Sequence, residues 1–153
     1  MSRKVLRGRP SDQPYLHKDF HGALSFAVDY VEDRFGEDAL RELLHRVART
    51  VYSPLIERAR ETGLDAIREH LCEVFAKESG DFEVTVKDHE LVFEVKKCPA
   101  LSHMREQGYR VAKHFCETTR VVNETIAQEL GWQSSVEYDQ ENGTCTQRFS
   151  IPK

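Results

Sequence analysis

The fold is set by the stretch 82–95, FEVTVKDHELVFEV. Apolar and polar residues alternate on both sides of residues 88–89, which is the period of a strand with one buried face. A two-residue turn there pairs Val86 with Leu91 and puts the apolar residues of both strands on one face. The same register gives the further pairs Val84–Phe93 and Phe82–Val95. We therefore predict a β-hairpin.

The half of the chain before this hairpin has a helical period instead. Apolar residues recur every three or four positions in four successive segments between residues 15 and 80. Their boundaries are marked by Gly36, Pro54, Gly63 and Gly80, residue types that end or begin helices. These segments are predicted to be four helices.

After the hairpin, a long helix is predicted from about Glu106 to Leu130, ended by Gly131. A second hairpin is predicted to turn at Asn142-Gly143, a strong signal for a two-residue hairpin loop. Its register would give the pairs Val136–Phe149, Tyr138–Gln147, Gln140–Cys145 and Glu137–Arg148.

The order of four helices, hairpin, long helix and hairpin predicts one α+β domain over residues 15–153. We expect the two hairpins to form one antiparallel sheet. Residues 1–14, which begin MSRKVLRGRP, are basic and lack the apolar centre of a signal peptide. They are predicted to be a flexible leader.

Composition narrows the function classes. The 153 residues suit a single core, with 39% hydrophobic and 31% charged residues. The net charge of -4 gives no basic footprint for nucleic acid, and no apolar run approaches a membrane span. We therefore expect no nucleic acid and no membrane as partners, a cytoplasmic location and a small-molecule ligand or substrate. A homodimer is compatible with the sequence.

Three cysteines of the second half stand in different settings. Cys98 ends a predicted strand before Pro99, Cys116 lies on the inward face of the predicted long helix, and Cys145 begins the last strand. If the fold brings them together, they form a thiol-rich site for a metal such as zinc or iron, or for nucleophilic chemistry. Their spacing matches no close-paired zinc motif, and each can equally pack as a small hydrophobe. Cys72 is interpreted as structural.

Polar residues beside Cys116 are candidates for the same site. Glu117 is placed to act as a general base, and Arg120 could bind a carboxylate with two hydrogen bonds. Asn123 lies on the apolar stripe of the predicted helix, where a buried amide needs a partner. All three can also be ordinary helix residues, since polar pairs at three-residue spacing are common on helix surfaces.

Two further candidates come from other elements. Tyr138 is predicted to share a hairpin face with Cys145. His21 follows His17 by four residues on the first helix, the spacing at which two imidazoles can share a metal, and small residues follow it. A histidine near a helix start is equally well explained by simple exposure to solvent.

The stretch from Phe93 to Ile151 resembles a known family. Its strand ending in Cys98, its helix with Cys116-Glu117 and its GTCTQRF hairpin are similar to the C-terminal half of the L-2-amino-thiazoline-4-carboxylic acid hydrolase-like proteins. The pattern is also similar to the 4-vinyl-reductase-like small-molecule-binding domains. By resemblance, the matching residues are Cys98, Cys116 and Cys145, while Glu117 stands where the hydrolase-like pattern tends to have an aspartate.

The first resemblance implies a hydrolase that opens a small cyclic or amide C–N bond with water. In that case Cys116 would be the nucleophile, or the three cysteines would hold a metal that activates water. Glu117 or His21 would move protons, and the substrate would contact Arg120, Asn123 and Tyr138. The second resemblance implies a non-catalytic module that senses a small molecule or a metal. A third reading is a helical interaction domain whose cysteines belong only to the core.

Overall fold

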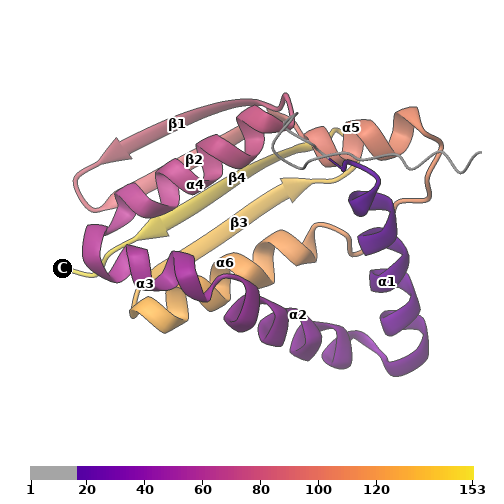
Figure 1. Cartoon of the computed structure of the whole chain (residues 1–153), viewed down its shortest axis with the longest axis horizontal. Coiled ribbons are helices and arrows are strands. Elements are labelled where there is room, and N and C mark those ends of the chain that lie inside the picture. The colour runs from indigo at the N-terminus through magenta and orange to yellow at the C-terminus, as the bar shows by residue number, and fades with distance from the viewer. Residues whose placement is uncertain (1–16) are drawn as a thin grey trace, which may run out of the picture.

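The computed structural model describes residues 17–153, so the expected leader at residues 1–14 lies outside the described residues. The chain forms, in order, the elements α1 (Phe20–Phe35), α2 (Glu37–Val51), α3 (Ser53–Thr62), α4 (Leu64–Lys77), β1 (Asp81–Lys87), β2 (Glu90–Lys97), α5 (Pro99–Glu106), α6 (Glu117–Leu130), β3 (Gln133–Asp139) and β4 (Thr144–Ser150) (Figure 1). The α+β class and the four N-terminal helices are confirmed.

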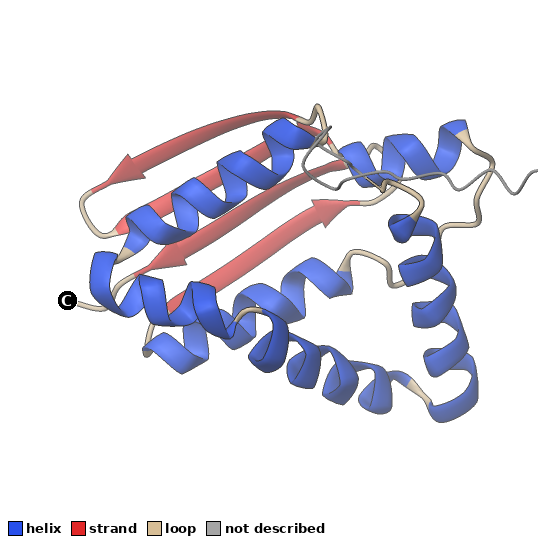
Figure 2. Cartoon of the chain, in the orientation of Figure 1, coloured by secondary structure: helices blue, strands red, loops and turns tan. Residues whose placement is uncertain are grey.

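The two hairpins form a single antiparallel sheet with strand order β1-β2-β4-β3 (Figure 2). The first hairpin has the expected register, with Val86 opposite Leu91. The hairpins join through β2 and β4, where Leu91 pairs with Phe149 and Val95 with Cys145. The prediction of one sheet built from two hairpins is therefore confirmed.

Helices cover one face of this sheet. α4 packs on β1 and β2, α6 packs on β3, and α3 lies between the two helices (Figure 1). The covered face contributes Leu91, Phe93, Val95 and Phe149, each buried. None of the helices described is long and apolar enough to cross a membrane.

A second core lies beside the sheet, where α2 crosses α6 and α1 packs against α2 and α5. It holds the buried residues Val28, Leu40, Leu44, Ala100, Leu101, Met104, Ala112, Phe115 and Val121. Cys98 and Cys116 pack against its edge. The cysteine region thus lies between the end of the sheet and this smaller core.

The predicted long helix from Glu106 to Leu130 is wrong. α5 ends at Glu106, residues 107–116 make no regular helix, and α6 begins at Glu117. Gly108 has a φ of 70°, which right-handed helices do not allow. The buried Ser25 of α1 also accepts the N–H of Ala112 and donates to the carbonyl of Arg110. These backbone groups therefore bond to α1 and not within a helix.

The predicted register of the last hairpin is also wrong, by two residues. The loop has four residues, 140–143, and Val136 pairs with Gln147. The side chain of Asp139 accepts the N–H of Asn142, and its carbonyl accepts the N–H of Gly143, which lengthens the turn. A shift of two keeps each residue on its predicted face. The observed pairs are Ser134–Phe149, Ser135–Arg148, Glu137–Thr146 and Tyr138–Cys145, with Gln140 in the loop.

Candidate functional site

The structure brings Cys98, Cys116 and Cys145 to the same end of the sheet. Cys98 precedes α5 and Cys116 precedes α6, each at the residue that caps the helix N-terminus. The loop of the last hairpin holds both: the N–H of Cys98 donates to the carbonyl of Gly143 at 2.8 Å, and the N–H of Cys116 donates to Oε1 of Gln140 at 3.1 Å. Cys145 follows this loop on β4, so three elements meet here.

Each of these thiols is held in its protonated form. Burial, followed by the neighbouring Cys98 and Cys145, raises the pKa of Cys116 to about 12. Burial also raises the pKa of Cys145 to about 11. The pKa of Cys98 is raised by burial, against an opposing effect of the Leu101 and Ala100 backbone N–H groups. At neutral pH the site therefore presents thiols, whereas a nucleophile or a metal ligand needs a thiolate.

The sequence predicted that the three cysteines could bind a metal ion. Among residues 17–153, no group of three or more His, Cys, Asp or Glu side chains is arranged to hold a metal ion. The three thiols converge without forming such a group. The expectation of zinc or iron stays a prediction.

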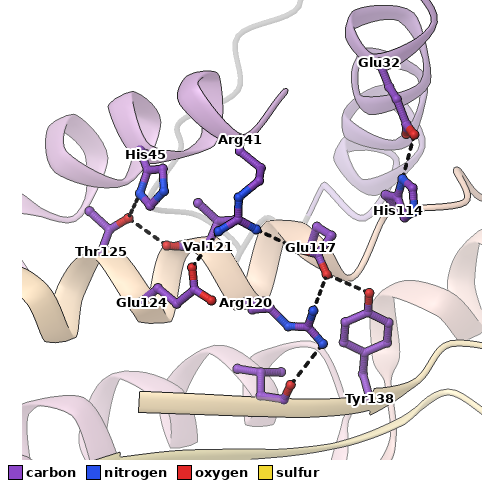
Figure 3. A network of polar contacts seen from close by, with 11 residues as sticks. Glu32, Arg41, His45, His114, Glu117, Arg120, Val121, Glu124, Thr125 and Tyr138 are labelled. Carbon is purple, nitrogen blue, oxygen red and sulfur yellow. Dashed lines mark hydrogen bonds and ion pairs between the residues drawn. The ribbon is translucent and has the colours of Figure 1, made fainter. Parts of the chain in front are cut away.

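Glu117 lies at the centre of a partly buried ionic cluster (Figure 3). Only 7% of the residue is exposed. Its Oε1 accepts the hydroxyl of Tyr138 at 2.7 Å and Nη1 of Arg120 at 2.9 Å, and its Oε2 accepts Nη1 of Arg41 at 3.2 Å. Two guanidinium groups and a phenol thus compensate one buried charge.

Arg120 and Tyr138 are committed to this cluster. Nη2 of Arg120 also donates to the carbonyl of Val136 at 3.4 Å, and its guanidinium lies 4.8 Å from the centre of the Tyr138 ring. Burial and the hydrogen bond to Glu117 raise the pKa of Tyr138 to about 12. The structure therefore brings three predicted site residues together, but their polar atoms are bonded mainly to one another.

Asn123 has the partner that its position required. Its Nδ2 donates to Oε1 of Gln147 at 2.8 Å, and both residues are buried. Nε2 of Gln147 in turn lies 3.6 Å from Sγ of Cys145. Asn123 therefore reaches the cysteines through Gln147.

His21 lies at the margin of the site. Its Nε2 is 2.7 Å from Oε2 of Glu78, whose carbonyl accepts Nζ of Lys18. The charge of Glu78 contributes to the raised pKa of Cys98. His21 is thus linked to the cysteines through Glu78.

Three residues important to this region were not among the sequence candidates: Arg41, Glu78 and Gln140. Arg41 comes from α2, and its second nitrogen also binds Glu124 of α6 at 3.0 Å. No local pattern marks these residues, because their roles depend on how helices far apart in sequence pack together. Gln147 carried a signal, since it was predicted on the same hairpin face as Cys145.

Comparison of the sequence with models of protein families and with curated proteins finds no match. The resemblance to the hydrolase-like and 4-vinyl-reductase-like proteins stays a prediction.

Proposed function

We propose that the chain is a non-catalytic module that binds a small molecule at the end of the sheet where its three cysteines meet. The observation that carries this proposal is the convergence of three thiols whose pKa values are all raised. Thiols in this state are weakly polar, polarizable groups suited to contact a ligand. They are poor nucleophiles, because the thiolate is the reactive form.

The surroundings favour a ligand with negative charge. α5 and α6 both begin at this site, and the N-terminus of a helix carries a partial positive charge. Arg105 adds a full positive charge that opposes the rise in the pKa of Cys98 and Cys116. The carboxylates of Glu78 and Glu117 act in the opposite direction on these pKa values, but they already pair with His21, Arg41 and Arg120. Leu101 and Phe115 provide apolar contacts nearby. A small carboxylate with an apolar body fits this combination.

Thermal unfolding in the presence of a panel of small carboxylates tests the proposal. A ligand of the site should raise the melting temperature of the wild type, and the shift should fall in Cys116→Ala and Cys145→Ala. Arg105→Gln should weaken binding of carboxylates more than of their amides, because it removes a charge. Cys72→Ala is the matched control and should keep the full shift. A shift that survives in all three of the other variants places the ligand elsewhere and contradicts the proposal.

A hydrolase that opens a C–N bond is the second candidate. The observation that favours it is the buried carboxylate of Glu117, a candidate general base, directly after Cys116 in the chain. Its negative charge adds to the effect of burial in raising the pKa of that thiol, so the reaction requires removal of the thiol proton as the nucleophile attacks. Incubation with a cyclic amidine carboxylate, followed by mass spectrometry, tests for the gain of one water. Turnover that is lost in Cys116→Ser and kept in Cys72→Ser would replace the binding proposal with a catalytic one.

The proposal includes a reducing compartment. All four cysteines are free, and the site as described requires three of them as thiols. A cytoplasmic location supplies those conditions.

A further inference from the structure

The outer face of α1 is apolar and exposed. Phe26 is 72% exposed and Tyr30 50% exposed, and their rings stack on one another. Ala23 and Ala27 are exposed beside them. Of the 16 residues in this helix, only Ser25 and Val28 are buried. A ridge of two aromatic side chains thus lies next to a shallow row of two alanines.

A groove of about 890 Å³ runs along this face. One side is α1, including Gly22 and Ala23, and the other is the segment with Tyr109 and Arg110. The Tyr109 ring lies so close to Gly22 that a Cβ there would be 2.7 Å from it. The groove is therefore narrow at its floor and open to solvent. Half of its ten lining residues are aromatic or small, and the other half are the charged residues Asp19, Asp29, Asp33, Arg34 and Arg110.

Opposite charges stand at the two ends of the same face. Asp19 immediately precedes α1, and hydrogen bonds from His103 and Tyr109 lower the pKa of its carboxyl. Arg34 lies in the last turn, with its guanidinium 6.0 Å from the centre of the Tyr30 ring. Both are exposed, and because His103 and Tyr109 both bond to Oδ1 of Asp19, a partner would meet the other carboxylate oxygen.

We propose that this face binds a second copy of the chain, with the two α1 helices antiparallel about a two-fold axis that passes between Phe26 and Ala27. Counting outward from that axis places Asp19 opposite Arg34 of the partner subunit. It also places Ala23 opposite Tyr30 of the partner subunit. The contact is therefore self-complementary in charge and in size, as a two-fold interface requires.

The same pairing places a side chain of the partner subunit in the groove. Tyr30 of the partner subunit lies over Ala23 at the open side of the groove, because the Tyr109 ring already packs on Gly22 and fills the floor. Aromatic side chains that fill such pockets contribute most of the binding energy of many interfaces. Another exposed apolar row, Leu43, Val47 and Val51, lies on α2.

Sedimentation of the full chain over a range of concentrations tests the dimer. The wild type should dimerise, and Phe26→Asp should raise the dissociation constant by roughly thirtyfold, as for loss of a central aromatic contact. Val51→Asp is the matched control, because Val51 is 62% exposed on α2, and it should leave the dimer intact. Circular dichroism verifies that each variant is folded.

A charge swap tests the register. Arg34→Asp alone places a pair of facing carboxylates at each end of the interface. Asp19→Arg alone places a pair of facing guanidinium groups at each end. Each should weaken the dimer about tenfold, and the double variant should restore it. A wild type that stays monomeric overturns the proposal, as does a dimer insensitive to Phe26→Asp or a swap without rescue. A monomer that dimerises only when residues 1–16 are deleted also overturns it, since that segment would then occupy the face.

Discussion

Glu117 shows how one residue can look catalytic in sequence and be structural in its contacts. A carboxylate beside a cysteine is typical of a nucleophilic site, and the burial of Glu117 strengthens that impression. Its oxygens, however, accept hydrogen bonds from Tyr138, Arg120 and Arg41. A base bonded to two guanidinium groups must give up those bonds before it takes a proton. The cluster therefore indicates that Glu117 holds α6 against α2 and β3.

The charge of Glu117 should matter for stability. Glu117→Gln keeps the shape of the side chain and leaves Arg41 and Arg120 without their shared counter-charge. We expect a loss of about 2–3 kcal/mol in the free energy of unfolding, measured by urea titration. Glu124→Gln is the control, because Glu124 pairs with Arg41 alone among residues 17–153 and is more exposed, and it should cost less than about 1 kcal/mol. Equal losses in the two variants would contradict the assignment of Glu117 as the centre of the cluster.

The raised pKa values of Cys116 and Cys145 predict how stability depends on pH. Their folded values of about 12 and about 11 lie above the ordinary value of 9.0. Above the ordinary value the unfolded chain ionises these thiols while the folded chain does not. Their contribution is therefore complete below about pH 9 and is lost as pH rises through the folded pKa values. Urea titrations from neutral pH to about pH 10 should show a shallower decline in Cys116→Val than in Cys72→Val, the matched control.

Sequence could anticipate which residues gather at the site better than it could anticipate their partners. The meeting of Cys98 and Cys145 follows from the pairing of the two hairpins, whereas Cys116 lies in the turn before α6 and not within the predicted long helix. The need of Asn123 for a partner was also visible, but its identity as Gln147 depended on the true hairpin register. Likewise, the link between His21 and Glu78 joins α1 to the residue after α4, which no local spacing reveals.

At the scale of elements, the alternation of apolar and polar residues predicted the strands correctly. The two wrong predictions, the turn of the second hairpin and the long helix, both lie where hydrogen bonds outside regular elements set the path of the chain. The first hairpin has the predicted register because residues 88–89 are its two-residue turn. In the second, Asn142-Gly143 indicated an equally short turn, but Asp139 accepts bonds from Asn142 that extend it. The long helix failed for a related reason, because Gly108 and Ser25 give the segment 107–116 an alternative set of backbone bonds.

The break at Gly108 can be tested directly. Gly108→Ala meets no atom within 4 Å, so the cost arises only from its φ of 70°, which side chains disfavour. We expect a loss of about 1 kcal/mol in the free energy of unfolding. Gln107→Ala is the matched control, because Gln107 has right-handed backbone angles, and it should be nearly neutral. A stabilising Gly108→Ala would mean that the predicted continuous helix forms after all.

At the scale of the whole molecule, the two cores differ in how they are supported. The sheet core is enclosed by strands on one side and by α3, α4 and α6 on the other. The smaller core depends on α1, which packs against α2 and α5 at the edge of the molecule (Figure 1). The cysteines lie between these cores, so a ligand bound there would contact both the sheet core and the smaller core.

This difference predicts the order in which the structure opens. Amides of β2 and β4, the two central strands, should exchange hydrogen most slowly, because their opening requires global unfolding. Amides of α1 should exchange at a lower free energy of opening, because this helix buries only two residues. Hydrogen exchange read by mass spectrometry checks both. Dilution of the proposed dimer should speed exchange in α1 and leave β2 and β4 unchanged. If α1 is as protected as β2 in dilute protein, the smaller core belongs to the same cooperative unit as the sheet, and the expected order is wrong.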